Sequence, residues 1–387
     1  MRVLYCNPSF WDYRLPFYKR LKELFKGEFY VIYSPKRYCG REKLLAKIKN
    51  TLGKNALPYE NELMFDVHTR SFSHFSEGYQ QIPLPLGLLR RIHKIHPDIL
   101  ITEGFFQWTP LVVLYSLLFR IPVFMGYERT LYTERNSGRI RKWHRKFTDL
   151  FIQGYLVNGS ETKKYLLSIG IKESKIHIGG MSADSEGLRK GIASLAIKEK
   201  ESMINKYKKK GGIVFLFCGA LIERKGVEPL LKAWREYTQT HPNDTLLIVG
   251  GGELENKLNS EFNSIPTVYL EGKKEYSEVC KYYAIADVFI LPTIEDNWSL
   301  VIPEAMSCGL PVATSIYNGC HPELIHEKEN GITFDTFKQE SIIQALEFFH
   351  GRDLKVMGKK SIEFEKPFDT EHCAQRTYNA IINNCNK

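Results

Sequence analysis

The sequence has little that would place the protein in a metal-binding or disulfide-stapled class. Its cysteines are scattered and contain no C-x-x-C pair: Cys6, Cys39, Cys218, Cys280, Cys308, Cys320, Cys373 and Cys385. This spacing argues against a zinc site and favours reduced thiols in a cytoplasmic setting. No Asp-x-Asp pair or multi-histidine cluster has metal-like spacing, so we expect no cofactor and no obligatory metal.

Long apolar runs are also lacking. No stretch approaches the roughly 20 apolar residues of a membrane-spanning helix. The start, MRVLYCNPSF, predicts a first strand and not a signal peptide, because its apolar run is short and enters a turn at Asn7-Pro8. Trp108–Phe119 is predicted to be a buried helix, with membrane contact as the alternative. We expect a cytoplasmic protein, with peripheral attachment to the inner face of the cell membrane as a further possibility.

Length and composition are those of an ordinary globular protein. The chain has 387 residues, 43% hydrophobic and 25% charged. It exceeds the usual size of a single hydrophobic core, which predicts two domains.

Positive charge is concentrated in the first half. Residues 1–200 hold 33 Lys and Arg against 18 Asp and Glu, a balance of +15, whereas residues 201–387 hold 21 against 26, a balance of −5. A basic half could serve nucleic acid, an anionic membrane surface or a phosphorylated acceptor, or could simply be solvated. We expect no nucleic acid, since no binding motif is recognisable.

Strand-like runs alternate with helix-length segments, which predicts an α/β fold with doubly wound parallel sheets. A lysine-rich segment, Ser185–Gly212, is predicted to be a linker and lead-in helix. We therefore expect domains at 1–190 and 191–367, with a C-terminal helix of about 368–387 packing back on the first. The strands expected in the first half are Arg2–Cys6, Phe29–Tyr33, Ile99–Thr102, Pro122–Met125 and Tyr155–Asn158.

The segment Leu291–Val312, LPTIEDNWSLVIPEAMSCGLPV, carries the most chemical information. The apolar run before it, IADVFILP, predicts a buried parallel strand, so the loop leaves the strand's carboxyl end, where open α/β sheets bind ligands. Asp296 and Glu304 lie eight positions apart across the junction with a helix. Acids placed in this way can accept hydrogen bonds from the hydroxyls of a sugar or ribose.

This segment resembles the signature of the retaining, nucleotide-sugar-dependent glycosyltransferases of family four, also called glycosyl transferases group 1. Their pattern is two glutamates separated by seven residues, the second in a Glu-Ala-Met-Ala-Cys-Gly-x-Pro-Val helix. Glu304-Ala305-Met306-Ser307-Cys308-Gly309-Leu310-Pro311-Val312 matches it closely, and Asp296 takes the place of the first glutamate. The resemblance implies a GT-B fold, two Rossmann-like domains facing each other across a cleft.

Other segments of the second half agree with this resemblance. The loop GALIERKG after a strand-like run resembles the family's phosphate-binding loop, with Lys225 in the position of a basic ligand and Ala220 in that of an arginine, for which Arg224 is the candidate substitute. A solvated position is the alternative for Arg224. The donor-binding residues implied are Gly219, Arg224, Lys225, Gly250, Gly251, Lys273, Glu295, Asp296, Asn297, Ser299, Leu300 and Glu304.

The first half is where the family binds its acceptor. Glu128 lies where the family has a histidine, and we predict a role in orienting the sugar or the incoming hydroxyl; a salt bridge with Arg129 or Arg135 is the alternative. Arg14 stands in a loop where the family often has a glycine pair. The acceptor-binding residues predicted are Arg14, Glu103, Tyr127, Glu128 and Arg129.

The resemblance implies transfer of a sugar from a nucleoside diphosphate sugar to a hydroxyl of a glycan or lipid-linked glycan acceptor, with retention, in cell-surface polysaccharide, O-antigen, capsule or glycolipid biosynthesis. Asp296, Glu304, Glu128 and Lys225 are the catalytic candidates. Two rival functions are a GT-B-fold nucleotide-sugar epimerase and a noncatalytic sugar-nucleotide-binding relative.

Overall fold

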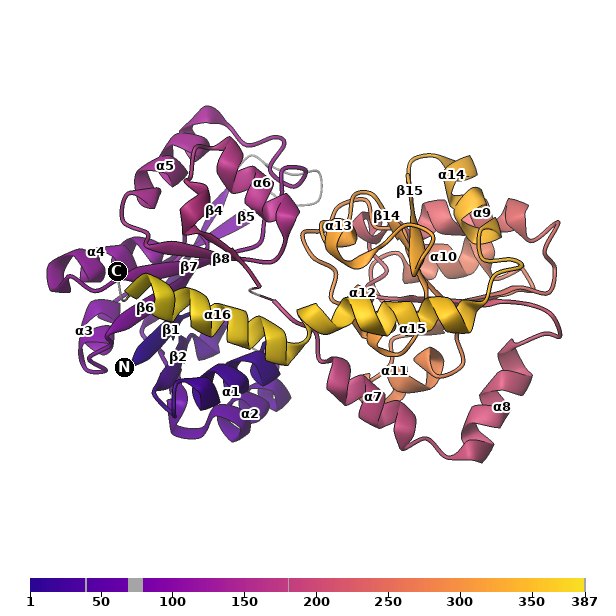
Figure 1. Cartoon of the computed structure of the whole chain (residues 1–387), viewed down its shortest axis with the longest axis horizontal. Coiled ribbons are helices and arrows are strands. Elements are labelled where there is room, and N and C mark those ends of the chain that lie inside the picture. Colours follow the sequence, from indigo (N-terminus) through magenta and orange to yellow (C-terminus); the bar gives the residue numbers. More distant parts are fainter. Residues whose placement is uncertain (39, 69–78, 180, 386–387) are drawn as a thin grey trace. The chain divides into compact units, whose positions relative to one another are not determined.

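The computed structural model describes residues 1–38, 40–68, 79–179 and 181–385. They divide into two compact units (Figure 1): unit 1, Met1–Ser182 with Thr370–Lys387, and unit 2, Ala183–Asp369. The division falls before helix α7 (Ser185–Ala193), whereas the sequence analysis placed the boundary after residue 190. The expected linker is instead α7 followed by a second helix, α8 (Ile197–Tyr207).

Unit 1 is built on a parallel sheet of seven strands in the order β3-β2-β1-β6-β7-β8-β9. Its strands alternate in the side that each residue faces: Leu4 and Cys6 lie in one core cluster, Val3 and Tyr5 in the other. The strands are β1 (Val3–Cys6), β2 (Phe29–Tyr33), β3 (Ala56–Pro58), β6 (Ile99–Glu103), β7 (Val123–Tyr127), β8 (Gly154–Val157) and β9 (Ile176–Ile178).

Helices cover both faces of this sheet (Figure 1). One core cluster contains side chains of α1 (Arg14–Leu24), α2 (Glu42–Leu52) and α16 (Thr370–Cys385). The other contains side chains of α3 (Leu88–His93), α4 (Thr109–Phe119) and α6 (Ser160–Ser168). Unit 1 also has α5 (Arg139–Asp149) and an antiparallel pair, β4 (Glu62–His68) with β5 (Tyr79–Pro85).

Unit 2 has a parallel sheet of six strands in the order β12-β11-β10-β13-β14-β15. Strands β11, β13 and β14 are buried along their whole length, as expected of a parallel sheet covered on both faces. The strands are β10 (Val214–Cys218), β11 (Thr245–Val249), β12 (Val268–Gly272), β13 (Val288–Leu291), β14 (Val312–Ser315) and β15 (Gly331–Phe334).

The remaining helices of unit 2 surround this sheet. They are α9 (Val227–Tyr237), α10 (Glu255–Phe262), α11 (Tyr276–Tyr283), α12 (Val301–Ser307), α13 (His321–Leu324), α14 (Gln339–Glu347) and α15 (Leu354–Glu365). Within the described ranges, no helix is long and apolar enough to cross a membrane.

The predicted α/β class with two doubly wound parallel sheets is confirmed. In each sheet the strand order reverses once, between β1 and β6 in unit 1 and between β10 and β13 in unit 2. The crevice at such a switch point is where open α/β sheets bind ligands. The prediction that Trp108–Phe119 is a buried helix was wrong in part, because Leu114, Leu117, Leu118 and Phe119 are exposed on α4.

Candidate functional site

The switch point of unit 2 brings a basic loop against an acidic one. Arg224 and Lys225 follow β10 in a short 3-10 helix, and Gly226 then begins α9 with φ +68°. A Cβ on Gly226 would lie 1.9 Å from the carbonyl oxygen of Pro292, at the end of β13. Only glycine permits this approach, which holds the basic loop next to the loop that follows β13.

Asp296 is buried and pairs with the basic loop. Its Oδ2 lies 2.5 Å from Lys225 Nζ and 3.6 Å from Arg224 Nη1. Arg224 also donates a hydrogen bond of 2.8 Å to the carbonyl oxygen of Glu295, so its guanidinium lies toward the acidic loop. The structure thus gathers two cations and one carboxylate, a local excess of positive charge.

Electrostatics keep this carboxylate ionised. Burial disfavours the charged form, but the charges of Lys225 and Arg224 outweigh that penalty and hold the pKa of Asp296 below its ordinary value. A buried, ionised aspartate next to two cations suits a site in which hydroxyls and anionic oxygens are both bound.

Asn318 supports the acidic loop from behind. It is fully buried, and its Oδ1 accepts a hydrogen bond of 3.4 Å from the backbone N–H of Ser299. Its backbone forms a bridge with Asp296, and Asp296 accepts at its carbonyl from Gly319 N–H. Complete burial of Asn318 could not be read from an Asn-Gly pair, which is common in any turn.

Glu304 lies in the first turn of α12, close to the end of β10. Burial, and then the charge of Glu304, raises the pKa of the Cys218 thiol to about 12. Since α12 follows the loop that leaves β13, Glu304 in its first turn lies near the carboxyl edge of the sheet. Leu300, which precedes α12, accepts a hydrogen bond from the Glu304 N–H at 3.2 Å. Asn297 is half-buried between the two acids.

The glycine-rich loops meet at the same edge. A Cβ on Gly250, after β11, would lie 1.8 Å from the carbonyl oxygen of Gly219, after β10. A Cβ on Gly251 would lie 3.2 Å from the Cβ of Lys273, which follows β12. The predicted donor residues are therefore all at the carboxyl ends of neighbouring strands of one sheet.

In unit 1, three predicted acceptor residues line one cavity at the switch point. Arg14 begins α1, Glu103 ends β6 and Tyr127 ends β7. Arg14 is buried, and its Nη2 lies 3.3 Å from Glu103 Oε1, while the Tyr5 hydroxyl donates to Glu103 Oε2. Arg14 is therefore already matched by a carboxylate, which reduces the charge it presents to a phosphate.

The cavity also depends on residues that the sequence analysis missed. Asn158, Leu156, Phe17 and Thr377 of α16 complete its lining. Gly126 is required on β7, because a Cβ there would lie 2.6 Å from the Tyr5 hydroxyl. The sequence analysis expected this helix to pack on the first domain but did not link it to this cavity, since more than 240 residues of chain separate it from β7.

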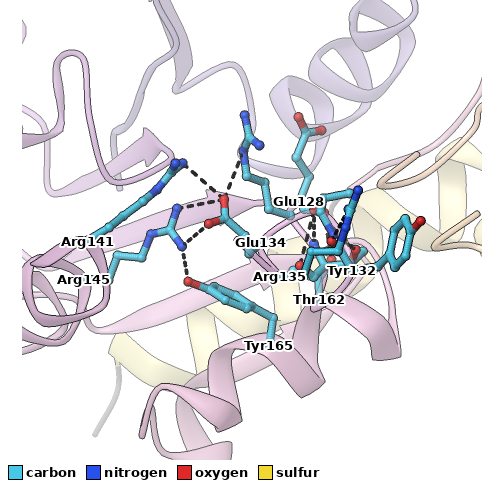
Figure 2. Close-up of polar contacts among 11 residues, drawn as sticks. Glu128, Tyr132, Glu134, Arg135, Arg141, Arg145, Thr162 and Tyr165 are labelled. Carbon is cyan, nitrogen blue, oxygen red and sulfur yellow. Dashed lines mark hydrogen bonds and ion pairs between the residues drawn. The ribbon is translucent and has the colours of Figure 1, made fainter. Parts of the chain in front are cut away.

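The remaining two acceptor candidates diverge (Figure 2). The carboxylate of Glu128 points away from the cluster around Glu134, and its carbonyl oxygen accepts from Thr162 Oγ1 at 2.9 Å. Arg129 Nε instead lies 3.4 Å from Glu134 Oε1. Arg135 donates to the carbonyl of Tyr132. Arg129 therefore belongs to the ion-pair cluster around Glu134 and is not among the residues that line the acceptor cavity.

Among the described residues, no three His, Cys, Asp or Glu side chains gather as in a metal site. The seven cysteines in the described ranges are all free thiols: Cys6, Cys218, Cys280, Cys308, Cys320, Cys373 and Cys385. The expectation of no obligatory metal stays a prediction.

Comparison with known proteins agrees with the geometry of unit 2. Residues 199–355, which contain the basic loop, the acidic loop and α12, match the family model of glycosyl transferases group 1. The matched segment is 157 of the 387 residues, and over it the chain is similar to this family.

Curated relatives are similar over parts of their length. The sulfoquinovosyl transferase SQD2 of Arabidopsis thaliana is 25% identical over 331 residues, which cover 79% of this chain and 62% of that protein. An uncharacterised glycosyltransferase of Haemophilus influenzae is 31% identical over 150 residues, 37% of this chain and 41% of that protein. The chain thus spans less than two thirds of the length of these relatives.

Among solved structures, Anabaena HepE in complex with UDP and glucose is similar with a TM-score of 0.72 at 12% identity, over 99% of this chain and 100% of that one. At this identity the similarity shows the fold, a GT-B architecture, and no more.

Proposed function

We propose that the protein is a glycosyltransferase that moves a sugar from a nucleoside diphosphate sugar to an acceptor hydroxyl. The observation that carries this proposal is the buried ion pair between Lys225 and Asp296 at the switch point of unit 2. It combines a cation for a diphosphate with a carboxylate for sugar hydroxyls. The family match over the same loops supports it.

The chemistry follows from these groups. Lys225 and Arg224, with N–H groups near Ser299 and Leu300, would bind the diphosphate, and their charge would stabilise it as the bond from phosphate oxygen to the anomeric carbon breaks. Glu304 would accept from ribose hydroxyls and Asp296 from sugar hydroxyls. The acceptor oxygen then bonds to the anomeric carbon, and its proton passes to the departing diphosphate oxygen. Retention of configuration is proposed from the resemblance to the family.

Unit 1 would bind the acceptor, which we propose is a glycan or lipid-linked glycan of a cell-surface polysaccharide, O-antigen, capsule or glycolipid. The cavity of Arg14, Glu103 and Tyr127 offers both a donor and an acceptor of hydrogen bonds for such hydroxyls. We place the protein in the cytoplasm, where it could lie on the inner face of the membrane.

The donor is tested by measuring the unfolding temperature of the full chain with UDP-, GDP- and other nucleotide sugars. A bound donor at a hundred times its dissociation constant should add about 2.7 kcal/mol of stability. Mass analysis with an acceptor panel then detects transfer. A converted donor without acceptor would identify the rival epimerase, and binding without any turnover would favour the noncatalytic relative.

The site is tested with three variants. Glu304→Ala should lose donor binding and turnover together, whereas Asp296→Ala should keep nucleotide binding and lose turnover by about 10- to 100-fold, as expected for a hydrogen bond to a charged group. Lys232→Met removes a lysine of α9 that pairs with Glu228 near the surface and should behave as the wild type. Full activity in Glu304→Ala would refute the site.

A further inference from the structure

Helix α5 of unit 1 is amphipathic in the reverse of the usual sense. Its buried side chains are Arg145 and Thr148, and Arg141 is partly buried beside them. Surface helices normally turn apolar residues to the core and charged ones to water. In α5 the polar face is buried, and large apolar side chains lie on the outer face.

The inward face is held by one buried carboxylate (Figure 2). Both oxygens of Glu134 accept from Arg145, at 2.8 and 2.9 Å, and Arg141 Nη2 lies 3.2 Å from Oε1. Arg145 also donates to the Tyr165 hydroxyl. A two-pronged ion pair of this kind fixes the rotation of the helix about its axis. These ion pairs therefore fix which side of α5 faces the interior and which faces outward.

The outward face combines large apolar side chains with lysine and arginine. Ile140, Trp143, Phe147 and Leu150 are between 49% and 84% exposed, and their spacing of three and four residues puts them on one stripe. Arg139, Lys142 and Lys146 are exposed along the same side. None of these three forms an ion pair with a described carboxylate. The exposed residues of α5 include no acidic side chain.

Neighbouring segments extend the apolar surface. Phe106, 47% exposed, stacks on His144 of α5 with ring centroids 5.0 Å apart. Trp143 stacks on Phe147 at 5.7 Å. Contiguous exposed apolar side chains with a polar rim mark interaction sites.

We propose that this outer face of α5 docks unit 1 on an anionic lipid bilayer. Trp143, Phe147, Ile140 and Leu150 would enter the boundary between headgroups and acyl chains, and Arg139, Lys142 and Lys146 would contact anionic headgroups. A short helix with Trp, Phe and Leu on its face and Lys or Arg beside them has the composition of interfacial helices. Charge complementarity selects an anionic membrane, because each basic residue near such a surface adds to binding.

The proposal is tested by sedimentation of the full chain with vesicles of phosphatidylcholine alone and with equal parts of phosphatidylglycerol. The wild type should sediment with the anionic vesicles and weaken at 1 M salt, where the screening length falls to about 3 Å. Emission of Trp143 should shift to the blue on binding. Trp143→Phe should keep binding and lose that shift.

Two matched sets of variants locate the surface. The first removes three charges from α5: Arg139→Gln, Lys142→Gln and Lys146→Gln. The second removes three exposed charges from unit 2: Lys198→Gln, Lys200→Gln and Lys210→Gln. The first set should weaken binding to the anionic vesicles roughly a hundredfold, because each basic residue near such a surface contributes about 1 kcal/mol of binding free energy. The second set should weaken this binding far less.

Apolar contact is tested in the same way. Ile140→Ser should weaken binding about tenfold, the loss expected for an aliphatic side chain that leaves an apolar contact, and Ile197→Ser, 77% exposed on α8, should leave it unchanged. Circular dichroism confirms folding of each variant. Absence of binding at low salt, equal loss in both charge sets, or equal binding to neutral vesicles would overturn the proposal. So would a dimer in solution that Trp143→Ser dissociates without any vesicle binding, which would identify a second copy as the occupant.

Discussion

At the scale of single residues, the pair of Lys225 and Asp296 is the most consequential contact. The sequence placed both at a ligand-facing edge but gave no sign that they touch, because residues 71 positions apart in sequence meet only through the pairing of β10 with β13. In the absence of ligand each neutralises the other. In the proposed function, a donor diphosphate would therefore share Lys225 with Asp296.

The lowered pKa of Asp296 predicts how stability depends on pH. A carboxylate with a folded-state pKa below its unfolded value near 3.9 adds stability at neutral pH, and that stability disappears as pH falls through the folded-state pKa. The free energy of unfolding of the wild type should exceed that of Asp296→Asn at pH 7, and the difference should shrink below about pH 4. Urea titrations across this range measure it.

Asp12→Asn is the control for this experiment. Asp12 pairs with Lys47 at 3.0 Å, with both side chains about half exposed. A surface pair of this kind contributes at most about 1 kcal/mol, so the variant should match the wild type closely at every pH. A pH-independent difference for Asp296→Asn would show that its charge plays no part in stability.

At the scale of elements, the loops at the carboxyl edge of unit 2 depend on close backbone contact. Gly226→Ala should destabilise the protein more than Gly351→Ala, because both have positive φ but only Gly226 would bring a Cβ against a carbonyl oxygen. The conformation alone should cost about 1–2 kcal/mol, and the clash should add to it. Thermal unfolding of the two variants separates these contributions, and equal costs would refute the packing argument.

Helix α5 allows a second prediction at this scale. Glu134→Gln leaves Arg145 buried without its counter-charge and should destabilise unit 1 by about 3–5 kcal/mol. Glu161→Gln, which breaks an exposed pair with Lys164, should cost at most about 1 kcal/mol. Chemical unfolding followed by tryptophan fluorescence compares them.

Elements with buried apolar residues were predictable, and those that break the pattern were not. The strand predicted from IADVFILP is β13, because it buries a continuous run of apolar side chains. Helix α5 gave no such signal, since its buried contacts are arginines that depend on Glu134. Likewise, the exposed leucines of α4 could not be told from core residues by composition. The donor loops were predicted from their resemblance to the family's loops, and the structure places their glycines and charges directly after strands.

At the scale of the whole molecule, the two units differ in how the chain builds them. Unit 2 is continuous, whereas unit 1 needs α16, which brings Cys373, Ala374 and Ile381 into the core beside α1. In a chain that ends at Asp369, backbone amides should therefore lose protection from hydrogen exchange in unit 1 only.

Hydrogen exchange tests this difference. In the shortened chain, amides of β1 and β2 should exchange at least about tenfold faster, while those of β10 and β11 should keep the rates of the full chain. Ala374→Ser and Ile381→Ala offer milder versions of the same change. Uniform acceleration across both sheets would mean that α16 stabilises the units together.

The late position of α16 also affects synthesis. A ribosome delivers the six strands of unit 2 complete before the last helix of unit 1 emerges, so the second unit can finish folding first. Until then Leu21 of α1 and Phe25, just beyond the end of α1, are not yet covered by α16. The nascent chain would carry that apolar surface throughout translation of unit 2, which makes this face a natural target for a chaperone.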